Sequence, residues 1–470
     1  MAVEVSVIAT SSLGDRSYLA HDGRVAVVVD AQRDIDRVLY LAGAKGVRIT
    51  HVVETHIHND YVSGGLELAR ITGARYLVAA DDEVDFDRMA VSDGETVPVS
   101  GSLRLRVIAT PGHTFHHLSY VLDEATGGGW QPAGVFTGGS LLFGTTGRTD
   151  LLGKEHAHEL ARHQHASAQR LADLLPDGAA VWPTHGFGSF CSASQSDAPE
   201  STIGREKQAN EVLRLAADDF VTHTLSGLDA YPAYYAHMGV ANLAGPAPVD
   251  LTPVTRADAA QLRERIANGE WVVDLRHRKA YATSHVAGTV SLGLDGPMST
   301  WLGWLIDWGA PITLLAETPE QVADAQRELV RIGIDRPAAQ ATGVAEQWAA
   351  DREQLRELRM ADFPALAAAR AGNTPAGLPS PDVVLDVRMT NEWTAGHIDG
   401  AVHIPLPDLP QRLADVPAGA VWVHCGSGYR ATAAASLLAN AGRDVVVIDD
   451  KFDQSETAGV AMAEQGFPRS

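Results

Sequence analysis

The stretch that decides the fold of the amino-terminal region reads Val52-Val-Glu-Thr-His56-Ile-His58-Asn-Asp60-Tyr61, and it leads into Gly64-Gly65. It starts with apolar residues typical of a buried strand and continues with alternating ligand-type side chains. In an extended segment, every second side chain points to the same side, so His56, His58 and Asp60 would project together. Imidazole nitrogens and carboxylate oxygens suit zinc or iron. The stretch therefore predicts a metal site at a strand end.

Two further histidines follow strand-like segments in the same region. The sequences Thr110-Pro-Gly-His113 and Pro183-Thr-His185-Gly each place a histidine in a tight loop. Three strand-end histidine loops in one domain favour a shared metal site over isolated structural roles. The simpler alternative is that these histidines cap strands or hydrogen-bond to neighbouring loops. The candidate metal ligands are His56, His58, Asp60, His113 and His185.

Around these loops, short apolar runs alternate with helical stretches. Residues 25–29 are continuously apolar, as in a strand buried on both faces, and residues 157–175 are predicted to be helical. A further helical stretch is predicted at residues 205–238, before a loop rich in glycine and proline at residues 242–252. The pattern indicates an α/β domain that ends near this loop.

The rest of the chain contains an internal repeat. One copy has Val273-Asp-Leu-Arg276 followed by His285, and the other has Leu385-Asp-Val-Arg388 followed by His397. In both, the histidine comes eleven positions after the aspartate (285 − 274 and 397 − 386). The repeat predicts two small α/β domains. We place the domains at residues 1–245, 253–350 and 356–470.

The second copy contains a candidate nucleophile. Its sequence Val421-Trp-Val-His-Cys425-Gly-Ser-Gly-Tyr-Arg430 begins as an apolar strand and leads into an alanine-rich helix. Backbone N–H groups of such a loop and the positive end of the helix dipole lower the pKa of a thiol, which makes its sulfur nucleophilic. A buried structural cysteine is the alternative.

Composition excludes several classes of protein. The 59 acidic residues exceed the 37 basic ones, and the net charge of −22 argues against nucleic-acid or anionic-membrane partners. Two cysteines are too few for a disulfide framework and fit a reduced compartment. Residues 1–12 do not resemble a secretion signal, and no apolar run could span a membrane. We therefore expect a cytoplasmic protein. The second cysteine, Cys191, is expected to be a small buried residue, with a redox or relay thiol as the alternative.

These motifs together resemble the metallo-β-lactamase fold superfamily and, within it, persulfide dioxygenases fused to rhodanese domains. The shared motifs are Thr55-His-x-His-x-Asp60, Thr110-Pro-Gly-His113, Thr137-Gly-Gly139, Gly147-Arg-Thr-Asp150, Thr184-His185-Gly and Cys425-x-x-x-x-Arg430. The resemblance implies an α/β multidomain protein, with an αββα metallo-β-lactamase sandwich followed by two rhodanese-like α/β domains. It also implies a mononuclear non-haem iron held by two histidines and one aspartate.

Two positions depart from the family pattern. The histidine that usually follows the aspartate of the first motif is Tyr61, and the usual Thr-Gly-Asp ends in Gly139, so one carboxylate ligand is absent. His58 or Asp60 could complete the ligand set instead. Iron is the expected metal, and zinc or a metal-free site are the alternatives.

The resemblance also assigns roles in substrate binding. Arg148 matches a residue near the thiol substrate, although a salt bridge to Asp150 in its own loop would account for it equally well. Arg430 is expected to pin the Cys425 loop or meet an anionic substrate. The loop residues expected to contact substrate are Gly426, Ser427, Gly428 and Tyr429.

The resemblance implies an enzyme of sulfide or persulfide metabolism. The amino-terminal domain would oxidise a low-molecular-weight thiol persulfide to sulfite, and Cys425 would transfer a sulfane sulfur, with sulfite or thiosulfate as small-molecule partners. Ala316 and Gln321 replace the cysteine and arginine in the first copy, which would then be inactive. A thioester hydrolase and a metal-free persulfide-binding module are the alternatives, and a homo-oligomer is left open.

Overall fold

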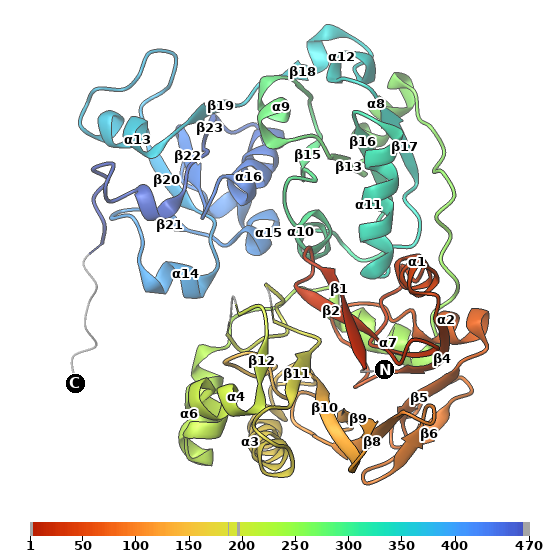
Figure 1. Ribbon diagram of the computed structural model, residues 1–470. Helices are drawn as coiled ribbons and strands as arrows, with labels where there is room; N and C mark the ends of the chain where they lie inside the picture. The colour runs from red at the N-terminus through yellow and green to blue at the C-terminus, as the bar shows by residue number, and fades with distance from the viewer. Residues whose placement is uncertain (1–2, 187, 195–197, 464–470) are drawn as a thin grey trace. The chain divides into compact units, whose positions relative to one another are not determined.

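The computed structural model describes residues 3–186, 188–194 and 198–463, which form two compact units (Figure 1). The first unit comprises Met1–Asp250 with Leu329–Gly333, and the second comprises Leu251–Glu328 with Ile334–Ser470. Residues 1–2 and 464–470 of the expected domains lie outside the described residues. The separation of the second unit into domains at residues 253–350 and 356–470 stays a prediction.

Two six-stranded sheets form the centre of the first unit. One sheet has the order β1-β2-β3-β4-β5-β6 and the other β12-β11-β10-β9-β8-β7. The first consists of β1 (Glu4–Thr10), β2 (Asp15–His21), β3 (Val25–Val29), β4 (Arg48–Val53), β5 (Arg75–Ala79) and β6 (Met89–Val91). The second consists of β7 (Thr96–Pro98), β8 (Leu103–Ala109), β9 (Leu118–Thr126), β10 (Gly129–Gly138), β11 (Ala180–Pro183) and β12 (Ser201–Thr202).

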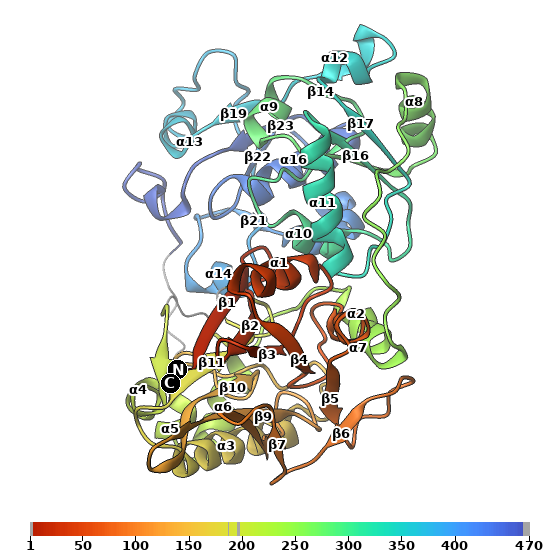
Figure 2. The same ribbon diagram turned by 45° about the vertical axis from the view of Figure 1, so that its right-hand side comes forward.

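The two sheets pack face to face with helices outside them. Tyr18 and Val53 of the first sheet share a buried cluster with Leu105, Tyr120 and Phe136 of the second. The helices are α1 (Asp36–Lys45), α2 (Gly65–Thr72), α3 (Ala157–Leu174), α4 (Ile203–Ala209), α5 (Glu211–Arg214), α6 (Ala217–Gly227) and α7 (Tyr235–Ala244). α1 and α2 pack on the outer face of the first sheet, and α3 and α6 on that of the second (Figure 2). The expected αββα sandwich is confirmed.

The helical stretch predicted at residues 205–238 is divided into several helices. α4 ends at Ala209, and the side chain of the next residue, Asn210, accepts a hydrogen bond from the backbone of Val212 at 3.3 Å and so caps α5. Pro232 lies in the segment between α6 and α7. Caps and proline therefore interrupt what the composition alone suggested was a continuous helical region.

The second unit contains two parallel sheets. Their orders are β15-β13-β16-β17 and β19-β23-β22-β20-β21, and β14 pairs with β18 separately. The strands are β13 (Trp271–Asp274), β14 (His285–Val286), β15 (Val290–Ser291), β16 (Ile312–Ala316), β17 (Ala339–Thr342), β18 (Leu355–Arg356), β19 (Arg359–Ala361), β20 (Val383–Asp386), β21 (Val402–His403), β22 (Val421–His424) and β23 (Val445–Ile448). The helices are α8 (Ala259–Ala267), α9 (Arg278–Thr283), α10 (Met298–Leu305), α11 (Pro319–Arg331), α12 (Ala345–Trp348), α13 (Phe363–Arg370), α14 (Thr390–Ala395), α15 (Leu409–Arg412) and α16 (Tyr429–Asn440).

The sequence repeat has a structural counterpart in these sheets. β13 corresponds to β20 and β16 to β22, and the order of the shared strands is the same in both copies. Asp274 and Asp386 end the matching strands, and each pairs with the arginine two positions later. Among the described residues, no helix has both the length and the apolar character that a membrane crossing requires.

Candidate functional site

Three histidines converge at one edge of the sandwich in the first unit. His56 follows β4, His113 follows β8 and His185 follows β11. One ring nitrogen from each lies within 4.8 Å of the others, and all three side chains are buried. The expected strand-end loops therefore bring three imidazoles together from segments far apart in the sequence.

Neighbouring groups orient these rings. Nδ1 of His113 donates to the backbone oxygen of Arg148 at 2.7 Å, while its buried Nε2 has no hydrogen-bond partner among the described residues. Nδ1 of His56 lies 2.9 Å from the Thr55 hydroxyl. The Nε2 atoms of His56 and His185 lie 3.2 Å apart. Hydrogen bonds at Nδ1 thus leave Nε2 for a ligand, as in many metal sites.

The charges of the three histidines differ. Burial, followed by neighbouring histidines, lowers the pKa of His56 well below its ordinary value, and burial lowers the pKa of His113 to about 3. Burial also opposes the charge of His185, but the carboxylates of Asp60 and Asp15 raise its pKa to about 10. His56 and His113 are therefore neutral, the form that binds metal, whereas a metal would have to displace a proton from His185.

Asp60 and Asp15 flank His185. Nδ1 of His185 lies 3.0 Å from Asp15 Oδ1 and 3.1 Å from Asp60 Oδ2. Within the described residues, neither oxygen of Asp60 has a well-aligned hydrogen-bond donor, although the side chain is buried. A buried carboxylate with so few partners is costly unless a cation lies near it. Protonated His185 supplies that cation when no metal is bound. The three imidazoles, whose ligand atoms lie within 4.8 Å of one another, fit a metal ion that displaces the proton.

His58 is held by a separate set of groups. Its Nε2 lies 3.3 Å from Glu54, 3.4 Å from Asp30 and 3.0 Å from the Tyr61 hydroxyl. Although burial opposes its charge, Asp30 and Glu54 raise the pKa of His58 to about 9. β4 ends at Val53, so a loop and not an extended strand carries His56, His58 and Asp60. The rings of His56 and His58 nevertheless lie 4.1 Å apart between centroids, and Asp60 lies beside His185, so their joint role as metal ligands stays a prediction. His58, Asp60 and His185 form a second group with close ligand atoms, and Asp30, Glu54 and His58 form a third.

The space around His113 explains the absent carboxylate ligand. A Cβ atom at Gly139 would overlap the imidazole ring of His113, and one at Gly147 would also crowd that ring. The backbone N–H of Gly139 donates to Nε2 of His117 at 3.0 Å. Any side chain at position 139 would therefore require His113 to move.

Arg148 lies buried in its own loop network. Its Nε and Nη2 donate to the two oxygens of Asp150 at 2.7 and 2.8 Å, and Nη2 also donates to the backbone of Asp229 at 2.6 Å. Its guanidinium lies 4.7 Å from the Tyr231 ring centroid. This favours the salt-bridge interpretation, and contact with substrate stays a prediction.

Cys191 is fully buried in the first unit. Burial, followed by the nearby Asp60 carboxylate, raises the pKa of its thiol well above the ordinary value. A thiol that resists ionisation is a poor nucleophile. This favours the structural interpretation of Cys191.

Cys425 lies in a loop between β22 and α16. Its Sγ accepts hydrogen bonds from the backbone N–H of Gly428 at 3.1 Å and of Ser427 at 3.5 Å. Gly428 has φ +94°, and a Cβ there would collide with the Asp449 carboxylate, so glycine is needed for both conformation and space. The predicted backbone cradle is present, at the start of a 12-residue helix.

Arg430 and Tyr429 point to different partners. Arg430 donates to both oxygens of Glu392, and a Cβ at Gly426 would lie 3.1 Å from Arg430 Nη2. The Tyr429 hydroxyl donates to the backbone of Gly293 at 2.9 Å. Ser427 is exposed, so it lies where an incoming molecule could meet the loop.

Sequence reasoning missed several residues around both sites. Asp15 comes from β2, 170 positions before His185, and nothing in its local sequence marks it. Glu392 had a usable signal, because the repeat aligns it with Ala280 (392 − 386 and 280 − 274) and Arg430 with Gln321. The first copy lacks both partners of the pair, and Gln321 instead accepts a hydrogen bond from the backbone of Glu317 at 2.8 Å.

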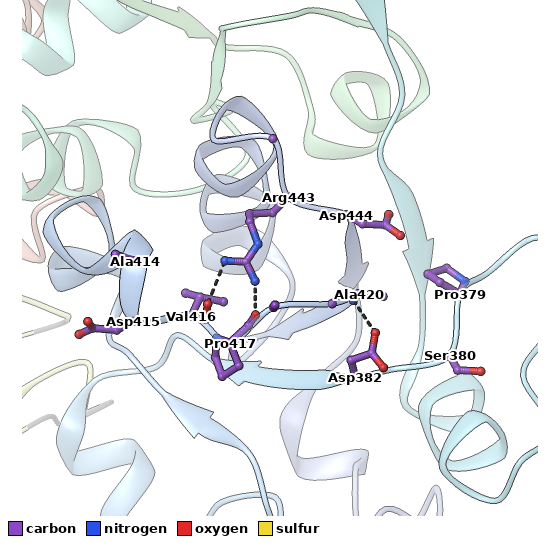
Figure 3. Close-up of a pocket in the computed structure, with 13 residues that line it drawn as sticks. Pro379, Ser380, Asp382, Ala414, Asp415, Val416, Pro417, Ala420, Arg443 and Asp444 are labelled. Carbon is purple, nitrogen blue, oxygen red and sulfur yellow. Dashed lines mark hydrogen bonds between the residues drawn. The ribbon is translucent and has the colours of Figure 1, made fainter.

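A broad surface hollow in the second unit is unrelated to these groups (Figure 3). It lies at the strand ends before β20, β22 and β23, whereas the Cys425 loop follows the opposite end of β22. In Figure 3, Arg443 is directed at the backbone oxygens of Val416 and Pro417, and Asp382 accepts from Ala420. These polar side chains are engaged by backbone and are not arranged for a ligand.

Known proteins show clear similarity to both parts of the chain. Residues 372–456 match the Rhodanese-like domain family. The amino-terminal part is 28% identical over 223 residues to human mitochondrial persulfide dioxygenase ETHE1, covering 46% of this chain and 76% of that protein. A hydroxyacylglutathione hydrolase of Acidiphilium cryptum is 31% identical over 161 residues, covering 34% of this chain and 59% of that protein.

Solved structures confirm the fold class. A metallo-beta-lactamase from Staphylococcus aureus subsp. aureus COL superposes with a TM-score of 0.65 and 28% identity, and the match covers 73% of this chain and all of that one. Homology to persulfide dioxygenases and the rhodanese match support an enzyme of sulfur metabolism. The chain therefore joins a region of metallo-β-lactamase fold, homologous to persulfide dioxygenases, to a rhodanese-like domain at residues 372–456.

Proposed function

We propose that this protein oxidises a low-molecular-weight thiol persulfide to sulfite in its amino-terminal region and transfers a sulfane sulfur through Cys425. The observation that carries the transfer step is the hydrogen bonding of Cys425 Sγ to the backbone N–H groups of Gly428 and Ser427. Such donors stabilise a thiolate and a persulfide anion alike. The similarity to a named persulfide dioxygenase supports the oxidation step.

The transfer step balances without a cofactor. The Cys425 thiolate attacks the outer sulfur of a donor such as thiosulfate, the donor S–S bond breaks, and sulfite leaves with the bonding electrons. Cys425 then carries one additional sulfur as a persulfide. A thiol, sulfite or cyanide attacks that sulfur and restores the thiolate.

For the first unit, we propose that His56, His113 and His185 hold the metal, with Asp60 and Asp15 orienting His185. Iron bound by three protein nitrogens would keep open positions at which oxygen and a substrate sulfur can meet. The unpartnered Nε2 of His113 and the buried Asp60 carboxylate support this set. The protein's own part is to hold these donors, keep His56 and His113 neutral and exclude bulk water.

The hydrolase alternative has a specific point against it. A two-metal hydrolase needs a second set of ligands, but Tyr61 stands where the family pattern has a histidine, which removes one ligand of a second site. Metal analysis of the purified protein separates the candidates. Iron near one atom per chain supports the dioxygenase, zinc supports the hydrolase, and absence of metal supports a binding module.

The sulfur-transfer proposal has a direct test. The full-length protein is incubated with thiosulfate, and the peptide containing Cys425 is examined by mass spectrometry. An added mass of one sulfur atom is expected on that peptide. Absence of the adduct, under conditions where a known sulfurtransferase acquires it, overturns the proposal.

A further inference from the structure

The two copies of the repeat meet at the Cys425 loop. The Tyr429 hydroxyl of the second copy donates to the backbone of Gly293 in the first, and a Cβ at Gly296 would collide with the Tyr429 ring. The Trp301 ring of the first copy lies with its centroid 5.4 Å from the Arg430 guanidinium. The first copy therefore touches the residues that flank the candidate nucleophile.

Asp449 brings a negative charge close to this loop. It follows β23, and its carboxylate packs against Gly428, where it fills the space that a side chain would need. Gly428 is also the residue whose N–H donates to Cys425 Sγ at 3.1 Å. The Asp449 side chain is 8% exposed, so water screens its charge poorly. A like charge near a thiol disfavours the thiolate.

Two basic residues of the first copy contact the Asp449 carboxylate and offset its charge. Nε of Arg278 donates to Asp449 Oδ1 at 2.7 Å, and Nζ of Lys279 lies 3.5 Å from Oδ2. The same guanidinium also pairs with Asp295 of its own copy. Arg278 therefore lies between two carboxylates, and one of them is packed on the Cys425 loop.

The two copies of the repeat differ in sequence at the start of corresponding helices. α14 of the second copy begins Thr390-Asn391-Glu392, whereas α9 of the first begins Arg278-Lys279-Ala280. The second copy uses its helix to pair Glu392 with its own Arg430. The first copy has alanine at the position of that acid, and its two basic residues contact Asp449 of the neighbouring copy.

We propose that Arg278 is a positioning residue for Cys425, which acts by neutralising Asp449 beside the loop and so favours the thiolate. The role in catalysis rests on the proposed sulfur transfer through Cys425. The copy without a cysteine would then serve the active loop electrostatically as well as by packing.

Other charged and titratable groups also surround the loop and stay unchanged in the test. They are Arg430 and Tyr429 of α16, Glu392 of α14, Asp386 at the end of β20, Arg388 after β20, His424 of β22, Lys279 of α9 and Asp295 before α10. Of these, Arg430, Glu392, Asp386 and Arg388 pair among themselves. Arg278 and Asp449 form the ion pair beside Gly428, and the test changes the net charge there by replacing one or both residues.

The test measures thiol ionisation in the full-length protein. The rate of alkylation of Cys425 by iodoacetamide is followed against pH, with the Cys425 peptide quantified by mass spectrometry. Arg278→Ala is expected to raise the pH midpoint of the alkylation rate by about 0.5–1 unit. At a given pH below the midpoint, this corresponds to about three- to tenfold less thiolate. Arg278→Lys should restore part of the shift, and Arg278→Ala with Asp449→Asn should return the midpoint close to its original value.

Arg263→Ala is the matched control. Arg263, in the same copy, forms an exposed ion pair at 3.6 Å with Asp351, just past the end of that copy, and its loss should leave the midpoint unchanged. The proposal is overturned if Arg278→Ala leaves the midpoint unmoved, or if the shift persists in the double variant, which would indicate packing. A reactive Cys425 with an unmoved midpoint contradicts this inference alone, whereas a Cys425 that never acquires sulfur contradicts the proposed function.

Discussion

Arg430 donates from Nη2 to Glu392 Oε1 at 2.8 Å and from Nη1 to Oε2 at 2.5 Å. The same carboxylate accepts the backbone N–H of Met389 at 3.0 Å, at the start of α14. Burial opposes the charge of Glu392, but Arg430 holds the pKa of that carboxyl below its ordinary value. The arginine of the loop is thus already paired and positioned when a substrate arrives.

Replacing Glu392 tests this relationship. Glu392→Gln leaves the largely buried Arg430 without its counter-charge, so we expect the free energy of unfolding to fall by about 1–2 kcal/mol. This value takes the partial exposure of Glu392 into account. Urea unfolding measures the change. Arg412→Ala, which removes an exposed pair with Asp415 in the same copy, should have almost no effect. Equal losses in the two variants would contradict a special role for the Glu392 pair.

The nucleophile has its own prediction. Cys425→Ala should abolish sulfur transfer from thiosulfate to cyanide, because Ala316 offers no sulfur and burial raises the pKa of the Cys191 thiol well above its ordinary value. Cys191→Ala is the matched control, since the buried thiol of Cys191 resists ionisation, and it should keep most activity. Activity retained in the Cys425→Ala variant would exclude this residue as the sulfur carrier.

Metal content tests the three-histidine set. His185→Ala and His113→Ala should each lower bound metal by at least about tenfold, because each removes one of three nitrogen donors. Elemental analysis of the purified variants measures the change. His116→Ala provides the control, because His116 is partly exposed and pairs with Asp82. Full metal content in His185→Ala would show that the ligands lie elsewhere.

We expect that an aspartate at position 139, as in the family pattern, does not improve metal binding. Gly139→Asp places a side chain where the ring of His113 lies, so we expect lower metal content and a stability loss of about 1–3 kcal/mol from overpacking. Gly178→Asp introduces the same residue where a Cβ meets nothing within 4 Å, and should be tolerated. A Gly139→Asp protein with raised metal content and unchanged stability would contradict the packing argument.

Protonation of His424 at acid pH should lower the free energy of unfolding of the rhodanese-like domain. Burial lowers the pKa of His424 to about 4, whereas an unfolded histidine titrates near 6.5, so the unfolded chain binds the proton first. The stability from neutral His424 is therefore present above about pH 6.5 and decreases by about 1–3 kcal/mol as the pH falls toward 4. His424 lies against Phe363 and Phe452, so His424→Phe should flatten the pH dependence of urea unfolding.

The control for the acid effect is an exposed histidine. His223→Phe changes a side chain that is 63% exposed and pairs with Glu211, so the pH dependence should stay as in the unchanged protein. If His424→Phe leaves the slope between pH 6.5 and 4 unaltered, other groups account for the acid sensitivity.

The sequence allowed the fold to be predicted where the pattern is local. Apolar runs such as residues 25–29 located buried strands, and matched spacings identified the repeat, whose two copies share a strand order in the structure. The helical stretch at residues 205–238 was less accurate, because side-chain caps such as Asn210 divide it. Boundaries set by individual hydrogen bonds leave little trace in composition.

The candidate metal site was predictable in part. Each histidine could be found from its loop motif. The motifs did not show which of these histidines would lie together. The segment after Val53 is a loop and not a strand, and it places His58 against Asp30 and Glu54 as well as near His56. Asp15 could not be anticipated, since only tertiary packing brings it to His185.

Cys425 is only 1% exposed, so its sulfur lies below the surface of the loop that surrounds it. Under the proposed sulfur transfer, a donor that carries its sulfur at an unhindered end is expected to reach Sγ more readily than a donor with a bulky group beside that sulfur. Burial of the thiol would then add a requirement of shape to that of charge.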